Sequence, residues 1–413
     1  MNPDPTPCGS NSEDQQGACR ESTIDSQEGT GLYLYLGKDD FAKHLVTDEE
    51  LNEREAERLQ AQVAIRTLLQ QRVPCLSRSA IQILVDQIDD TSSRINSGEP
   101  AESLEFSLRA FDGSTVEMEV ETGTIHPNYG GQEVVMAAPF LYYQTYQQLL
   151  ALSADPREFY PKQASCPLRI CYFARSRDPS TKQLLPVLRS NPLEEVRKAF
   201  ELSLRTWQAS EDCRRVEATL RTIRLSGSVS RIVALGNGTI SVDDTQRSAS
   251  QHALILTIRD GLQNLQAGSG VRIQCFAQDP MYTEIDKTIL QQVGITVLED
   301  PQALLEVSDE SVVLSFGPNI PVRQLVTDLA RPVIFICDKV RGEQELLDDW
   351  AKRFDPPRTW ANVEELEARL GDPESPRLRD LIQSDYEDAG KLHDENFAGA
   401  CIYIRRPDIS ISS

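Results

Sequence analysis

The sequence predicts an α/β fold: a Rossmann-like, mostly parallel sheet with helices on both faces, preceded by an α+β extension that contains a β-hairpin. Apolar segments without clean alternation recur through the C-terminal half, and helical patterns separate them. Strands that are buried on both faces and joined by helices are typical of a parallel sheet. A change to period two between residues 104 and 120 predicts the hairpin.

Strand and helix patterns alternate from residue 231 onward. The expected strands are RIVAL (231–235), VRIQCFA (271–277), GITVL (294–298), SVVLSF (311–316) and PVIFICD (332–338). Helical patterns lie between them at 248–265, 284–293 and 322–330, with a short linker helix before the fourth strand. A last apolar segment, ACIYIRR (400–406), is expected to form an antiparallel edge strand. We therefore assign residues 226–413 to a Rossmann-like domain with C-terminal helices.

The hairpin has a register that the sequence defines. A three-residue loop at 111–113 places Leu108 opposite Val116 and Phe106 opposite Met118, which keeps one face apolar. Such a loop needs a positive φ at its third position, and Gly113 stands there. The hairpin is expected to be structural.

The rest of the N-terminal region, residues 31–225, is mainly helical or ambiguous. A capping box at Thr47–Glu50 predicts a helix over about 48–70, and an apolar face predicts another over about 79–90. Asn191 as N-cap, followed by a proline, predicts a helix start, and a further helix is expected over about 211–224. Residues 121–190 are ambiguous, with a candidate strand at 169–175.

Composition excludes several classes of protein. The net charge of −22 argues against a nucleic-acid partner, because no basic stripe offsets it. The nine cysteines include no Cys-x-x-Cys pair, which fits a reducing compartment. Neither a secretory signal nor an apolar run near the roughly 20 residues of a membrane span occurs. We expect a cytoplasmic or nuclear protein with a disordered tail over residues 1–30.

The turn Gly236-Asn237-Gly238 leaves the first parallel strand and leads into a helix. Glycines there allow a ligand to approach the backbone, and the helix N-terminus offers N–H groups to an anion. The dinucleotide fingerprint is incomplete, because Ser241 occupies the position of its third glycine. The turn is therefore either a ligand loop or an ordinary strand-to-helix connection.

Other candidate site residues follow neighbouring strands. Asp279 ends the second strand, Gly317 and Asn319 follow the fourth, and Asp338 ends the fifth. The carboxyl ends of parallel strands form the edge where ligands bind. Asp279 also fits a cap or turn residue. The sequence offers no Gly-x-Ser-x-Gly elbow and no defensible nucleophile–base pair, and His252 fits a structural histidine better than a base.

Residues 231–337 resemble the SRR-like domain family, named for sensitivity to red light reduced. The resemblance depends on IVALGNGTI with the later Gln251 and Ala253, on AQDPMYTEIDKTILQQVGITVL, and on VVLSFGPNIPVRQLV. Two positions depart from the family: Phe-Gly-Pro-Asn replaces a frequent Pro-His-Cys, and Cys-Asp-Lys replaces a frequent Gly-Asn-Ser. The long N-terminal half is similar to that of divergent fungal-type members.

The resemblance implies a Rossmann-like fold and ties to light and circadian signalling in plants and to heme metabolism in yeast and animals. It implies no particular reaction. We consider a regulatory or ligand-sensing protein, an enzyme that binds S-adenosylmethionine or a nucleotide at Gly236, Gly238 and Asp279, and a scaffold that binds a protein partner through residues 31–225. The expected ligand is an adenine-type compound or heme, and the cofactor is left open.

Overall fold

The computed structural model covers all 413 residues. It describes residues 32–35, 48–96, 103–121, 125–127, 133–152, 163–178, 180–181, 185, 188–353, 360, 362–393 and 395–407. The tail predicted over residues 1–30 and the capping residue Thr47 lie outside these ranges.

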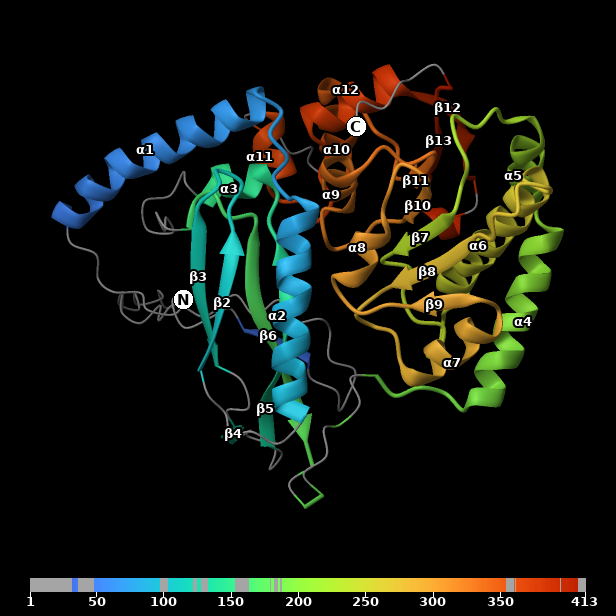
Figure 1. Ribbon diagram of the computed structural model, residues 1–413, viewed down its shortest axis with the longest axis horizontal. Helices are drawn as coiled ribbons and strands as arrows, with labels where there is room; N and C mark the ends of the chain where they lie inside the picture. The colour runs from blue at the N-terminus through green and yellow to red at the C-terminus, as the bar shows by residue number, and fades with distance from the viewer. Residues whose placement is uncertain are drawn as a thin grey trace, which may run out of the picture.

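A seven-stranded sheet forms the centre of the C-terminal half within the described residues (Figure 1). Its strand order is β12-β13-β11-β10-β7-β8-β9, and β7 to β11 run parallel. The strands are β7 (Arg231–Leu235), β8 (Gln274–Gln278), β9 (Ile295–Val297), β10 (Ser311–Ser315), β11 (Ile334–Cys337), β12 (Tyr386–Lys391) and β13 (Cys401–Arg405). The first five strands thus follow the doubly wound order 3-2-1-4-5, and the prediction of a Rossmann-like, mostly parallel sheet is confirmed.

The last strand differs from its prediction in one respect. β13 is antiparallel to β11, as expected, but it lies inside the sheet, and β12 forms the edge. The sequence of β12, YEDAGK, has mostly exposed side chains and therefore lacks the apolar pattern of a buried strand. The hairpin of β12 and β13 extends the sheet by two strands beyond β11.

Helices cover both faces of this sheet, which explains why its strands are apolar throughout. Ile232, Ala234 and Val312 point into a core with α4 (Leu193–Ala209), α5 (Glu211–Thr222), α6 (Gln246–Leu265) and α7 (Glu284–Gln292). Val233 and Val313 point into the opposite core, which contains residues of α8 (Gln302–Glu306), α9 (Val322–Leu329) and α12 (Pro376–Asp385). Two shorter helices, α10 (Glu343–Ala351) and α11 (Val363–Glu367), follow β11.

The N-terminal half packs against the second of these faces. α2 (Arg78–Asn96) contributes Ala80, Ile81 and Leu84 to the same core as Val313. Figure 1 shows α2 standing between the N-terminal strands and the large sheet. Arg78 of α2 donates to the carbonyl oxygens of Leu305 and Val307 at the end of α8. Apolar packing and hydrogen bonds therefore join the two halves.

The N-terminal strands form two sheets within the described residues. One has the order β1-β6-β5-β4, and its members are β1 (Leu32–Tyr35), β4 (Ile125–Pro127), β5 (Glu133–Tyr143) and β6 (Leu168–Arg177). The other is the hairpin of β2 (Ser103–Arg109) and β3 (Thr115–Glu121). Its register pairs Leu108 with Val116, and Gly113 has φ 88°. The predicted hairpin is confirmed.

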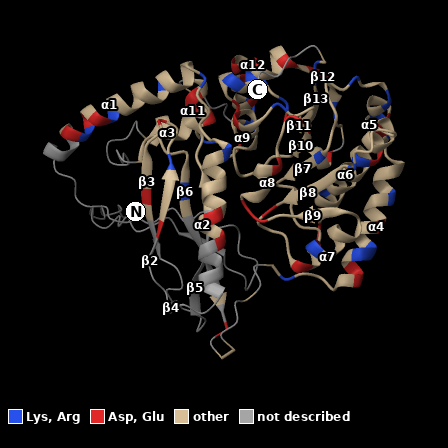
Figure 2. Cartoon of the chain, viewed as in Figure 1, with Lys and Arg blue, Asp and Glu red and all other residues tan. Residues whose placement is uncertain are grey.

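The predicted N-terminal helices are also present, with small differences. α1 spans Asp48–Gln70, and a short α3 (Tyr146–Leu152) follows β5. α4 begins at Leu193 after Pro192, whereas the Asn191 side chain donates to Asp243 and does not cap the helix. Acidic and basic residues are interspersed along the helices in the view of Figure 2. No helix of the described residues is both long and apolar enough to cross a membrane.

Candidate ligand site at the carboxyl edge of the sheet

The Gly236-Asn237-Gly238 turn follows β7 at the carboxyl edge and requires both glycines. Gly236 has φ 76° and Gly238 has φ 72°, a region that other residues rarely adopt. A Cβ atom on Gly236 would lie 3.1 Å from Cβ of Pro318, and one on Gly238 would lie 2.7 Å from Oγ of Ser248. The turn therefore packs tightly against the loop after β10 and the start of α6.

Three backbone N–H groups of the turn and the residues after it are engaged within the protein. The amide of Gly236 donates to the Gln278 carbonyl at 2.9 Å, and that of Gly238 donates to Oδ2 of Asp279 at 2.6 Å. The amide of Ile240 donates to Oδ1 of Asp286 at 2.8 Å. A phosphate-binding loop needs such groups free to face the anion. Amides bound to two carboxylates do not suit that role.

Asp279, which follows the neighbouring strand β8, stabilises the turn through its carboxylate. While its Oδ2 atom accepts from Gly238, its Oδ1 atom accepts the amide of Met281 at 2.9 Å. Burial raises the pKa of this carboxyl, and the two backbone hydrogen bonds oppose that rise. The contacts are those of a side chain that fixes the shape of the loop.

Asp286 of α7 lies beneath the turn and was not among the predicted site residues. It is fully buried and accepts from Oγ1 of Thr239 at 2.7 Å and from the amide of Thr283 at 2.6 Å. Thr283 and Asp286 form a capping box at the start of α7. The Thr-x-x-Asp spacing is a sequence signal for that capping box. The bonds from Asp286 to Thr239 and Ile240 become apparent only in the fold.

Asn237, between the two glycines, is the unusual member of the turn. Its side chain is 2% exposed, and neither Oδ1 nor Nδ2 has a hydrogen-bond partner among the described residues. A buried amide without partners costs about 1–3 kcal/mol for each unsatisfied group. Unsatisfied groups of this kind are rare in folded proteins and call for an explanation.

The loop after β10 brings further predicted residues to the same edge. Gly317 and Asn319 are exposed, whereas Pro318 between them is buried against Gly236. Arg247, from the start of α6, donates to the carbonyl of Phe316 at 3.1 Å. The turn and this loop are therefore in direct contact, as the prediction of a shared edge required.

Asp338, after β11, lies next to the same loop. It accepts a hydrogen bond from the backbone of Gly317, and its buried Oδ1 atom has no hydrogen-bond partner within the described part of the chain. Burial raises the pKa of its carboxyl, while the nearby arginines Arg323, Arg341 and Arg247 lower it. The edge thus continues from Asn237 through Gly317 to Asp338.

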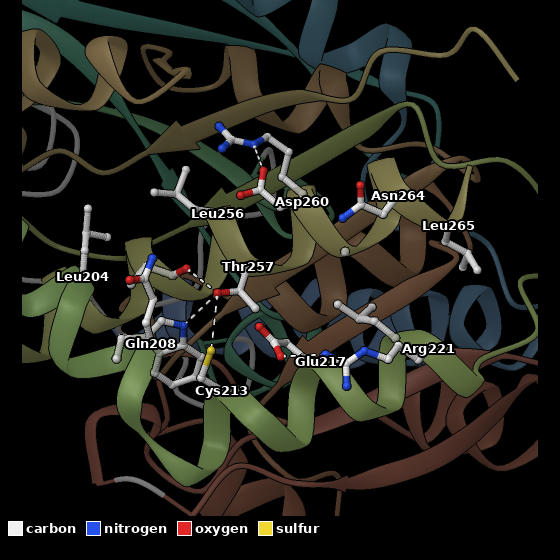
Figure 3. Close-up of a pocket in the computed structure, with 15 residues that line it drawn as sticks. Leu204, Gln208, Cys213, Glu217, Arg221, Leu256, Thr257, Asp260, Asn264 and Leu265 are labelled. Carbon is white, nitrogen blue, oxygen red and sulfur yellow. Dashed lines mark hydrogen bonds and ion pairs between the residues drawn. The ribbon is translucent and has the colours of Figure 1, made fainter. Parts of the chain in front are cut away.

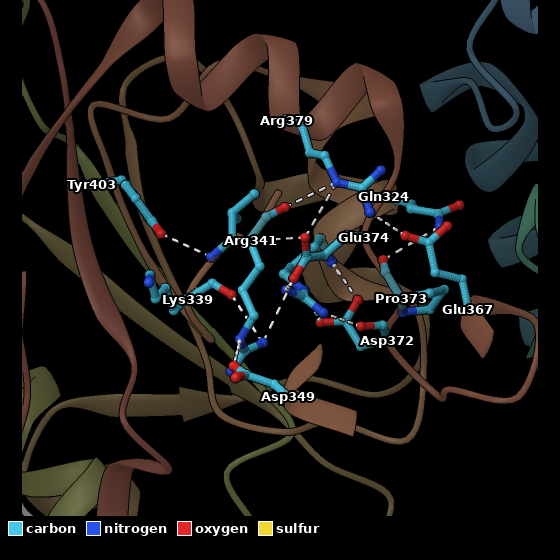
Figure 4. A network of polar contacts seen from close by, with 12 residues as sticks. Gln324, Lys339, Arg341, Asp349, Glu367, Asp372, Pro373, Glu374, Arg379 and Tyr403 are labelled. Carbon is cyan, nitrogen blue, oxygen red and sulfur yellow. Dashed lines mark hydrogen bonds and ion pairs between the residues drawn. The ribbon is translucent and has the colours of Figure 1, made fainter. Parts of the chain in front are cut away.

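A buried ionic network, which we call the Arg323 cluster, holds the loop after β11 (Figure 4). Its members are Arg323, Arg341, Glu367, Asp372, Glu374 and Arg379. Nε of Arg323 lies 2.9 Å from Oδ2 of Asp372, and the amide of Arg341 donates to Glu374 at 2.9 Å. Burial raises the pKa of Asp372 to about 6. The cluster fixes residues 339–341, which follow Asp338.

His252 and Cys275 are not poised for catalysis. Nδ1 of His252 donates to the Ser248 carbonyl at 2.6 Å, so Nε2 accepts from the Tyr282 hydroxyl at 2.7 Å. Burial lowers the pKa of His252 to about 4 and keeps the ring neutral. Burial also raises the pKa of Cys275 to about 11, so its thiol stays protonated. Among the described residues no group of His, Cys, Asp and Glu could hold a metal ion.

A cavity of about 510 Å³ lies away from this edge, between α4, α5 and α6 (Figure 3). It contains none of the residues that the sequence predicted for a site. We take the carboxyl edge as the candidate site because buried groups of Asn237 and Asp338 there have no hydrogen-bond partner among the described residues.

Comparison with known proteins identifies the domain. No curated protein matches the chain. A solved structure from Methanococcus maripaludis, described as a candidate S-adenosyl-L-methionine-dependent methyltransferase, aligns over 55% of this chain and 100% of its own, with 14% identity and a TM-score of 0.26. The family model of the SRR1 domain matches residues 216–404. The chain therefore carries an SRR-like domain, which contains the seven-stranded sheet and its carboxyl edge.

Proposed function

We propose that this protein is a ligand-sensing regulator whose SRR-like domain binds a small molecule at the carboxyl edge, beside Gly236–Gly238. The observation that carries the proposal is the buried amide of Asn237, whose donor and acceptor have no hydrogen-bond partner among the residues that the structure describes. A ligand that offers one acceptor and one donor would satisfy both groups. The resulting hydrogen bonds would be formed in a poorly solvated place, where they count most.

The electrostatics of the turn favour a ligand without phosphate groups. The amides of Gly236, Gly238 and Ile240 are engaged, and the carboxylates of Asp279 and Asp286 lie next to them. A polyphosphate would meet these two carboxylates, and the three engaged amides could not compensate for its charge. The site accordingly suits a neutral or cationic polar compound better than NAD(H), NADP(H), FAD or ATP.

Heme does not fit the described histidine at this edge. Both ring nitrogens of His252 are hydrogen-bonded within the protein, so neither is available as the axial ligand that heme iron commonly takes. Heme therefore serves as a comparison compound in the test and not as the expected ligand.

Thermal shifts of the purified full-length protein test the proposal. We expect a rise in Tm with S-adenosylmethionine, S-adenosylhomocysteine or another phosphate-free adenosine compound, and none with NAD(H), NADP(H) or ATP. A ligand at 100 times its Kd contributes about 2.7 kcal/mol of stability. Asn237→Ala removes the unsatisfied amide, so the ligand-free variant should be as stable as the wild type or more stable. It should lose the shift.

Asn52→Ala is the control, because Asn52 is exposed on α1, outside the SRR-like domain. This variant should keep the shift. Retention of the full shift in Asn237→Ala would contradict the proposal, and so would a dominant shift with a phosphate-bearing compound. Gly238→Val is a poorer probe, since its side chain would meet Ser248 and strain the backbone even without a ligand.

An S-adenosylmethionine-dependent enzyme is the second candidate. The internally bound amides favour it among adenine cofactors, because this cofactor is cationic at sulfur and carries no phosphate. Accumulation of S-adenosylhomocysteine when the protein and S-adenosylmethionine are incubated with a cell extract, absent with Asn237→Ala, would favour the enzyme. Binding without product would favour the sensor.

A further inference from the structure

The cavity between α4, α5 and α6 lies outside the proposed carboxyl-edge site and has the size of a small-molecule pocket. Its volume of about 510 Å³ falls within the range of roughly 300–1,000 Å³ for ligand pockets. Three helices that pack on one face of the sheet form its walls, so their positions are fixed by the core beneath them. Figure 3 shows Thr257 of α6 pointing toward Cys213 of α5, whereas Leu256 and Asp260 extend from the other side of α6.

The base of the cavity is apolar with one satisfied polar contact. Trp207 and Cys213 are buried, and the Trp207 indole donates to Oγ1 of Thr257 at 2.8 Å. The Thr257 hydroxyl in turn donates to the carbonyl of Ala253 at 3.1 Å. Leu256 is half-buried, and Leu265 is 44% exposed at the end of α6. Apolar surface is therefore available to a ligand without any broken hydrogen bond at the base.

A small residue allows α5 and α6 to approach each other at this place. A Cβ atom on Gly261 would lie 2.6 Å from Cδ1 of Leu220, so the two helices touch through this position. Both residues line the cavity. The contact holds the two walls at a fixed spacing, which suits a preformed pocket more than a groove that opens for a long helix.

The charges around the cavity compensate one another. Arg221 lies 2.9 Å from Glu217, and Arg259 lies 2.8 Å from Asp260. Arg259 also donates to the carbonyl of Val293 at 2.7 Å. A charged group on a ligand would compete with these ion pairs, because each of the four charged side chains already has a partner of opposite charge. Gln208 and Asn264 provide neutral amides at the exposed margin.

We infer that this cavity is a second binding site, for an uncharged and largely apolar small molecule with a neutral hydrogen-bonding group. Its occupant packs against Leu256 and Leu265 and reaches the amide of Asn264 with its polar end. The inference is independent of the carboxyl edge, because none of the residues of that site lines the cavity.

The probe for the test is N-phenyl-1-naphthylamine, a neutral apolar fluorophore that accepts energy from tryptophan. The chain has three tryptophans, so the double variant Trp350→Phe/Trp360→Phe leaves Trp207 as the sole donor. We expect saturable binding at one site with energy transfer from Trp207. The anionic fluorophore 1-anilinonaphthalene-8-sulfonate should compete poorly for the same signal.

Two exposed leucines provide a matched pair of substitutions in this background. Leu265 lines the cavity and is 44% exposed, whereas Leu202 lies on α4 outside it and is 59% exposed. Both tolerate a polar residue in the folded state because they face solvent. Leu265→Asp should raise the Kd of the probe at least tenfold, and Leu202→Asp should change it less than twofold.

Three results would overturn the inference: no saturable energy transfer from Trp207, an equal loss in both leucine variants, or stronger binding of the anionic fluorophore. Asn237→Ala should leave the probe affinity unchanged, which keeps this test separate from that of the carboxyl-edge site.

Discussion

Two buried polar clusters support the candidate site, and they are built from different chemistry. Asp286 receives its hydrogen bonds from hydroxyl and amide groups of Thr239, Ile240 and Thr283, all neutral. Arg323, in contrast, meets the carboxylates of Asp372 and Glu374. A carboxylate that accepts several neutral hydrogen bonds is well stabilised locally. A buried ion pair must instead offset the desolvation of every charge it contains.

The two clusters, one of neutral hydrogen bonds and one of ion pairs, also connect different parts of the protein. The Asp286 contacts join β7, its glycine turn and α7, which all lie within the SRR-like domain. The Arg323 cluster also reaches the N-terminal half, because Gln147 of α3 donates to Glu367 at 2.9 Å and to the carbonyl of Glu374. One cluster therefore shapes the turn itself, whereas the other ties the opposite end of the edge to the rest of the protein.

The largest effect is expected for Arg323→Met. The substitution leaves Asp372 and Glu374 buried without their guanidinium, and removal of one partner of a buried pair costs about 3–5 kcal/mol. Denaturant unfolding at pH 7 measures the loss in the free energy of unfolding. Arg247→Met, on the exposed side of the same edge, should cost under about 1 kcal/mol. Similar losses in both variants would show that the Arg323 cluster is not the stronger support.

Asp286→Ala should have the next largest effect. It removes the acceptor for at least two buried donors, each of which costs about 1–3 kcal/mol when left unsatisfied, so we expect a loss of about 2–4 kcal/mol. Glu284→Ala on the same helix is the control, since Glu284 is exposed and forms a surface ion pair with Lys287. Hydrogen exchange should show the 236–241 segment opening first in Asp286→Ala. Uniform exchange throughout the domain would contradict a local role.

Much of the fold could be predicted because it follows from local sequence patterns, such as runs of apolar residues and glycines at turns. The parallel strands were recognisable since residues such as Ile232 and Val233 are buried on opposite faces, which makes the strand apolar throughout. The hairpin register followed from Gly113, whose positive φ closes the loop. β12 could not be predicted in this way. Its residues Glu387, Asp388 and Lys391 are exposed, and their polar sequence is typical of a loop.

The candidate site was only partly accessible from the sequence. The glycine turn and the strand-end residues could be placed at one edge by their position in the chain, and their role in ligand binding stays a prediction. Arg323 and Glu374 are far apart in the sequence and form no local motif, so only the tertiary fold brings them together. The isolation of the Asn237 amide likewise depends on how surrounding loops pack.

A third contact between the halves should appear in the pH dependence of stability. Asp300 accepts from the Tyr143 hydroxyl at 2.8 Å and from Nε2 of Gln278 at 2.6 Å. Burial raises its pKa to about 6, above the roughly 3.9 of an unfolded aspartate. The folded state thus binds the proton more tightly, so this contribution is complete below about pH 4 and is lost as the pH rises through 6.

Asp300→Asn removes that titration and keeps the accepting oxygen. The free energy of unfolding of the variant minus that of the wild type should be larger at pH 8 than at pH 5, by about 1 kcal/mol. Asp372, whose pKa burial also raises to about 6, titrates in both proteins and cancels in the difference. Unfolding curves at the two pH values measure the effect. A difference of the opposite sign would mean that the charged form of Asp300 is the one the fold prefers.

The smallest effect is expected for an exposed pair that also bridges the two halves. Nη1 of Arg66 in α1 lies 2.8 Å from Oε1 of Glu364 in α11, and the two side chains are 52% and 37% exposed. Surface ion pairs contribute about 0–1 kcal/mol because water screens them and ordering two long side chains costs entropy. Arg66→Gln should therefore lower the free energy of unfolding by about 0.5 kcal/mol, and salt should remove most of that difference. A salt-independent loss comparable to that of Arg323→Met would show that bridging the halves, and not burial, determines how much a charged contact stabilises this protein.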